Sequence, residues 1–235
     1  MNRSRILNRP LRPEWLDISL RLARASSDGR AGRELLNVAL RDAPLAEEAR
    51  KKTVEAIHPV WLNPPSETAN LIRWGIEHSG QATDLRPLHL VALIATYPFF
   101  GDVCAAVGRS LRLENSVTNA DLRNRLHGRL GDREVVDVAA RKCIQTLRAF
   151  DVLTGQARSG ESTQGDQLLL PESFAAWAVH ALILSRNTDA IDGTEAESAP
   201  EFFFFLRLST GNVAGYPYLD RFAISPSRAA YAITV

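Results

Sequence analysis

The chain has 235 residues, of which 45% are hydrophobic and 23% are charged, values typical of a soluble globular protein rather than a disordered or fibrous one. Its net charge is only +1. The most apolar window, "LHLVALIATYPFFGDVCAAVG", is interrupted by His89, Pro98 and Asp102. Its longest apolar run is well below the roughly 18 residues that span a bilayer, so we expect no membrane segment.

The cysteines, Cys104 and Cys143, lie inside apolar helical patterns, without a CxxC partner or a histidine at metal-ligand spacing. Two such cysteines are typical of reduced core residues. Because structural disulfides are rare in reducing compartments, this usage favours a cytoplasmic protein.

The charge is unevenly distributed along the chain. Residues 108–160 contain 10 Lys/Arg against 6 Asp/Glu, a net charge of +4, whereas residues 161–235 contain 4 against 9, a net charge of −5. Residues 1–60 also have a net charge of +4, from 12 against 8. A basic segment inside a nearly neutral chain is compatible with a nucleic-acid surface.

Residues 1–83 are predicted to form a helical N-terminal region. Apolar residues recur at helical spacing in four segments, which are "RPEWLDISLRLARAS", "GRELLNVAL", "LAEEARKKTVEAIH" and "NPPSETANLIRWGIEHSG". Residues 84–113 then predict one long apolar helix or two helices broken at Pro98.

The next segment has the order of elements of a winged helix-turn-helix. Thr118 and Asp121 have the spacing of a capping box, which predicts a helix over residues 119–130. "GD" at 131–132 predicts a turn and a second helix over 133–150. "DVLTG", the polar loop "QARSGESTQG" and "DQLLLP" predict two strands joined by a hairpin. We therefore predict a winged-helix domain over residues 84–188.

The second of these helices has two different faces. Val136, Ala140, Cys143, Leu147 and Phe150 form an apolar stripe at steps of four and three. The opposite face is predicted to present Asp137, Arg141, Gln145 and Arg148.

Arg and Gln side chains on a helix can contact base edges in the DNA major groove, and nearby arginines can neutralise phosphates. The candidate DNA-binding residues are Arg109, Arg112, Arg123, Arg125, Arg129, Arg133, Arg141, Lys142, Gln145, Arg148 and Arg158. The alternative is a wing that only contacts other proteins, with a polar face that serves solubility and with Glu134 and Asp137 repelling phosphate.

The remaining residues predict a helix over 171–187, followed by a C-terminal region, 189–235, packed on the rest. In it, "TDAIDGTEAESAP" is expected to be an acidic loop and "EFFFFLRLS" a strand buried on both faces. "DRFAISPSRAAYAITV" predicts two final strands. The expected fold class is mainly α with a small β component.

Sequence motifs of common enzyme and metal sites are missing. The chain has no GxxxxGK[ST], GxGxxG, HExxH or GxSxG motif, and its five histidines lack metal-ligand spacing. We expect a protein that is not an enzyme and that holds neither a cofactor nor a metal.

Three segments resemble a known family. "ATYPFFGDVCAAVGR", "GDREVVDVAARKCIQTLRAFDVL" and "RFAISPSRAAYAITV" are similar to small helical, winged-helix proteins of bacterial phage-defence islands, nearest to the BrxA-like family of BREX systems. The resemblance implies a non-enzymatic component of a multi-protein anti-phage defence system that binds double-stranded DNA. The alternative within such a system is a scaffold that holds other defence proteins through the winged helix and the Phe-rich strand.

Overall fold

Three apolar helices form the centre of the fold in the computed structural model, which describes residues 5–25, 29–130, 134–155, 160–210, 215–225 and 228–234. At residues 29–31, 129 and 130 it describes the backbone only. The central helices are α5 (Arg86–Thr96), α6 (Pro98–Glu114) and α9 (Ala175–Arg186). Every residue of α5 from Pro87 to Thr96 is buried, because its sequence provides no polar face to turn toward water.

The predicted break at Pro98 is confirmed. Tyr97 separates α5 from α6, and the two helices meet at an angle of 117°. Proline fits the first turn of a helix, where its missing N–H is not needed, but disrupts a helix interior. No single helix within the described ranges is long and apolar enough to cross a membrane, and α5 and α6 pass that test only when they are joined across the bend.

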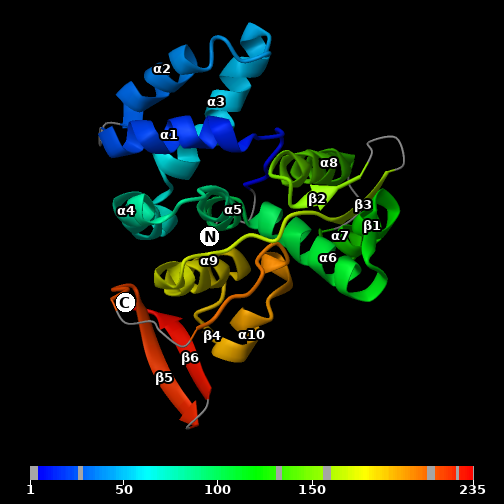
Figure 1. The fold of residues 1–235 in the computed structure, drawn as a ribbon. Helices are drawn as coiled ribbons and strands as arrows, with labels where there is room; N and C mark the ends of the chain where they lie inside the picture. Colours follow the sequence, from blue (N-terminus) through cyan, green and yellow to red (C-terminus); the bar gives the residue numbers. More distant parts are fainter. Residues whose placement is uncertain are drawn as a thin grey trace.

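The N-terminal residues form the predicted helices, and the first three of them lie at one end of the molecule (Figure 1). These are α1 (Pro13–Ala25), α2 (Gly29–Ala39), α3 (Glu47–Trp61), the 3₁₀ turn η1 (Ser66–Thr68), α4 (Ala69–His78) and the 3₁₀ turn η2 (Ser79–Gln81). His89 on α5 joins two of them. Its Nδ1 accepts a hydrogen bond of 3.1 Å from Trp61 Nε1, and its Nε2 lies 2.8 Å from Asp17 Oδ1.

A compact helix–strand unit follows the central pair. It contains β1 (Ser116–Thr118), α7 (Asn119–Leu130), α8 (Glu134–Ala149), β2 (Leu153–Thr154) and β3 (Glu161–Gln164). The strands form an antiparallel sheet in the order β1-β3-β2. The predicted capping box is confirmed, because Thr118 N donates to Asp121 Oδ2 and Asp121 N donates to Thr118 Oγ1, both at 3.1 Å.

The predicted position of the returning strand was wrong. The strand that pairs with β1 and β2 is the polar segment β3, not "DQLLLP" at 166–171. β3 ends just before Gly165, where a Cβ atom would lie 2.1 Å from the carbonyl oxygen of Asp151. After β3, Leu168 forms an isolated parallel bridge with Phe205 instead.

The C-terminal region packs on α6 and α9. It contains β4 (Ala190–Asp192), α10 (Gly193–Glu197), η4 (Pro200–Phe202), β5 (Leu219–Ser225) and β6 (Arg228–Ile233), with the second sheet in the order β4-β6-β5, whereas the short turn η3 (Glu172–Phe174) leads into α9. The two final strands were predicted correctly, and their hairpin projects from the end opposite α1–α3 (Figure 1).

Two predictions for this region were wrong. Residues 188–200 are not only a loop, since they form β4 and α10. "EFFFFLRLS" is not a strand, because it begins in η4 and continues as turns. Its phenylalanines are nevertheless buried, as ring-to-ring packing among Phe202, Phe204 and Phe205 replaces strand pairing.

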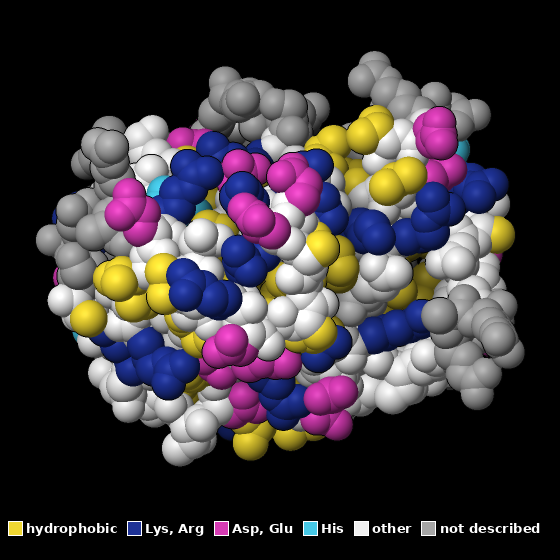
Figure 2. Space-filling model, turned by 90° about the horizontal axis from the view of Figure 1, so that it is seen from above, with side chains coloured by type: hydrophobic (Ala, Val, Ile, Leu, Met, Phe, Trp, Pro, Cys, Tyr) yellow, Lys and Arg dark blue, Asp and Glu magenta, His cyan; other side chains and the backbone are white. Residues whose placement is uncertain are grey.

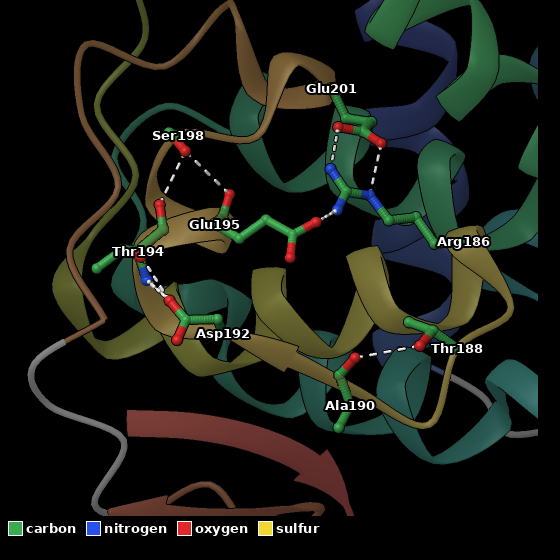
Figure 3. A network of polar contacts seen from close by, with 8 residues as sticks. All are labelled: Arg186, Thr188, Ala190, Asp192, Thr194, Glu195, Ser198 and Glu201. Atoms are coloured by element: carbon green, nitrogen blue, oxygen red, sulfur yellow. Dashed lines mark hydrogen bonds and ion pairs between the residues drawn. The ribbon is translucent and has the colours of Figure 1, made fainter. Parts of the chain in front are cut away.

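A polar network fastens this region to the central helices. Arg186, at the end of α9, forms two hydrogen bonds of 2.8 and 2.9 Å to the carboxylate of the buried Glu201 and also contacts Glu195 (Figure 3). Asp192 caps α10 by accepting from Thr194 N. Because both oxygens of Glu201 are paired, the burial of its charge is compensated. One continuous cluster of buried side chains extends from Leu7 to Tyr231.

We predict that the protein loses stability in mild acid through His180 on α9. This side chain is buried beside Tyr216, with Nδ1 2.6 Å from the hydroxyl oxygen. Burial lowers its pKa from 6.5 to about 4. As the pH falls, His180 takes up a proton in the unfolded chain before it does so in the folded protein. The contribution of neutral His180 to the free energy of unfolding is therefore complete above pH 6.5 and is lost as the pH falls toward 4.

The expected loss from His180 is about 2 kcal/mol between roughly pH 7 and pH 5. Urea unfolding of the parent and of His180→Phe at both pH values measures it. The variant should lose less stability on acidification than the parent. Equal losses would show that His180 does not contribute.

Candidate nucleic-acid interface

Helix α8 presents one face to the core and the opposite face to solvent. Cys143 and Leu147 are fully buried, and Val136 and Ala140 are nearly so, which confirms the predicted apolar stripe. Burial raises the pKa of the Cys143 thiol well above its usual value, so this cysteine is a protonated core residue. The orientation of α8 is therefore fixed by its own apolar residues.

The solvent face of α8 is basic and polar. Arg141 and Gln145 are exposed, and Lys142 is half-buried with Nζ 3.4 Å from Gln145 Oε1. Seen from above, Lys and Arg side chains are spread over both halves of the molecule, with Asp and Glu side chains among them (Figure 2). Three neighbouring donors on one helix face are suited to acceptor groups on a ligand.

Asp137 does not belong to this exposed face, contrary to the sequence prediction. Its carboxylate lies between two side chains of α7, with Oδ2 3.2 Å from Arg123 Nε and Oδ1 2.9 Å from His127 Nε2. The carboxylate thus joins α7 to α8, and its negative charge is paired with Arg123. Arg123 remains 54% exposed beside this pair, so the pair leaves its guanidinium accessible to solvent.

Arg148 is also not a free surface residue. Its Nη2 donates to the carbonyl oxygen of Glu161 at 3.0 Å and to Ser162 Oγ at 2.8 Å. These contacts tie the end of α8 to β3. The expectation that Arg148 lies on the open polar face with Arg141 was therefore wrong, because its guanidinium forms hydrogen bonds with β3.

The other predicted arginines are dispersed. Arg125 turns toward α6, where Nε donates to Ser110 Oγ at 3.1 Å and Nη2 lies 3.8 Å from Glu114. Arg109 and Arg112 are exposed on α6. Arg112 lines a groove of about 520 Å³ with Gln164 of β3 and the Phe-rich segment, so it is not brought together with Arg141.

Three predicted residues are not described in full. Arg133 and Arg158 lie outside the described residues, and only the backbone of Arg129 is described. The structure consequently brings together Arg141, Lys142 and Gln145 as the centre of the site.

An N-terminal segment that sequence reasoning missed borders α8. Leu7 and Leu11 are fully buried. The backbone N–H of Leu11 donates a hydrogen bond of 3.0 Å to Oγ1 of Thr146 on α8. The half-buried Arg9 lies between these two anchors. The available signal was the spacing of the two leucines in "RILNRPLR". Apolar residues four positions apart favour packing of one side of a segment against a core.

Among the described residues, no group of three or more His, Cys, Asp or Glu side chains is placed to bind a metal ion. The arrangement on α8 can donate hydrogen bonds and attract negative charge. Comparisons of the chain with protein families, curated proteins and solved structures found no match.

We predict that Arg148→Ala destabilises the protein, whereas Arg141→Ala leaves its stability unchanged. The first removes two hydrogen bonds that hold β3, at a cost of about 1 kcal/mol. The second removes an exposed side chain without an ion pair among the described contacts, with an effect within roughly 0.5 kcal/mol. Urea unfolding midpoints of both variants measure the difference. Equal midpoints would mean that Arg148 does not hold the hairpin.

Proposed function

We propose that this protein is a winged-helix protein that binds double-stranded DNA, with α8 as its recognition helix. The proposal is supported by the order of elements. From α6 to β3 the chain runs helix, strand, helix, helix, strand, strand, with the sheet order β1-β3-β2. In a helix-turn-helix, the second helix of the pair enters the major groove, and α8 occupies that place.

The observation that supports DNA most strongly is the solvent face of α8. Arg141 and Gln145 lie one turn apart and are both exposed, so they can contact adjacent base edges or phosphates. Lys142 adds a positive charge at the side of this face. The carboxylate nearest to this face in sequence, Asp137, is held by α7, whereas Glu134 at the start of α8 is exposed.

Long-range attraction is supported by the net charge of +4 in residues 108–160. Positive charge near the interface raises the association rate with DNA and makes binding sensitive to salt. The exposed Arg109, Arg112 and Arg123 contribute to this attraction without having to touch bases.

The resemblance to BrxA-like proteins extends the proposal to a biological setting. In that setting the chain is a non-enzymatic, DNA-binding component of a bacterial anti-phage defence system, and its partners are DNA and other defence proteins. DNA contact through α8 is compatible with this role because it requires no catalytic group.

A second candidate function is a scaffold that holds a partner protein. The observation in its favour is the edge strand β5, where Phe222 and Ile224 are each 54% exposed. The Phe-rich segment does not add to this surface, since its four phenylalanines are at most 8% exposed. An apolar interface of this kind would respond little to salt, unlike a DNA interface.

We predict that Arg141→Ala weakens DNA binding by about 1–3 kcal/mol, the range for a good direct contact. Fluorescence anisotropy with a labelled duplex of about 20 base pairs, two helical turns, at low salt gives the dissociation constants. The matched control is Arg221→Ala, which removes an exposed arginine from β5 at the far end of the molecule.

The control variant should bind like the parent. Parent protein that does not bind at micromolar concentration and low salt would contradict the proposal in favour of the scaffold. Equal affinities of parent and Arg141→Ala would remove α8 from the interface.

A further inference from the structure

Two valines on α8 are exposed, although most apolar residues of this helix are buried. Val135 is 55% exposed and Val138 is 37% exposed. β-branched residues lower helix propensity slightly, and the exposed part of an apolar side chain gains nothing from burial in the folded protein. Among the residues that the structure describes, burial in the core does not fully account for valine at these two positions.

Val138 lies on the same face as the polar residues of the proposed interface. Val138, Arg141 and Gln145 follow one another at steps of three and four, which places them along one side of the helix. Val138 is one turn nearer the helix N-terminus than Arg141. The N-terminal residues of a recognition helix contact the base edges, so Val138 occupies a position where the helix approaches the bases.

The major groove of DNA offers one apolar group, the C5-methyl of thymine, which pairs with apolar side chains. A valine suits this contact because its side chain is stiff and loses little rotational freedom when it is covered. RNA offers no such target, since uracil lacks the methyl group and the A-form major groove is too deep and narrow for side chains to enter.

We propose that Val138, with Val135 beside it, contacts thymine C5-methyl groups, so that α8 prefers DNA with thymine at the contacted positions. This inference rests on the proposed function, because it assigns the ligand chemistry of the same helix face. It makes the interface a partly selective one, in which Arg141 and Lys142 supply general attraction and Val138 supplies a preference for base type.

A double-mutant cycle between protein and DNA tests the contact directly. The two duplexes are an alternating A·T duplex and the same duplex with deoxyuridine in place of every thymidine, which removes only the methyl groups. The two proteins are the parent and Val138→Ala. Each affinity is measured by anisotropy at the same low salt concentration.

The parent should bind the deoxyuridine duplex about fourfold more weakly for each thymine methyl group that a valine would otherwise cover, the equivalent of burying one methylene group. Val138→Ala should bind the thymidine duplex more weakly than the parent does and should distinguish the two duplexes less than the parent does. The matched control is Val38→Ala on α2, a valine that is 53% exposed and distant in sequence. This control should keep the parent's preference.

Two results would overturn the inference while leaving the proposed function intact. The first is equal binding of the parent to both duplexes, with Arg141→Ala still weaker. The second is a preference that persists unchanged in Val138→Ala, which would assign it to DNA shape instead of the methyl contact. Parent protein that binds neither duplex would overturn both proposals.

Discussion

Burial of α5, α6 and α9 is the constraint on which the rest of the structure depends. These helices have almost no polar face, so they are stable in water only when other elements cover them on every side. The N-terminal helices cover one side, the α7–α8 pair covers another and the C-terminal region covers a third. The backbone of the C-terminal region lies very close to α6 at Gly108. A Cβ atom at this position would lie 2.1 Å from the carbonyl oxygen of Pro200.

The same constraint fixes which face of α8 meets solvent. The helix covers the core with its stripe from Val136 to Leu147, and the N-terminal segment anchored at Thr146 covers one flank. Asp137 and Arg148 are engaged by α7 and β3 on the other flank. What remains open is a face with Glu134, Val135, Val138, Arg141, Lys142 and Gln145, and the proposed ligand must fit that face.

The sequence was sufficient for elements with strong periodic or capping signals, such as α1, α8 and the Thr118–Asp121 capping box. It failed where tertiary contacts override local pattern. "DQLLLP" has the composition of a strand, but β3 already pairs with β1 and β2, and Leu168 instead forms a bridge with Phe205. The structure brings together three residues of the predicted site, Arg141, Lys142 and Gln145, but not Arg148 or Asp137. Helical spacing predicts on which side of a helix a residue lies, but not which neighbouring element forms a hydrogen bond or ion pair with its charged group.

The salt dependence of DNA affinity tests the central claim, a DNA interface on the open face of α8, most directly. The logarithm of the association constant falls linearly with the logarithm of the salt concentration, with a slope of about −0.9 for each phosphate neutralised. The account predicts a steep slope for the parent and a clearly shallower one for the double variant Arg141→Ala/Lys142→Ala, with unchanged unfolding curves. A slope near zero for the parent, or identical slopes for both proteins, would contradict it.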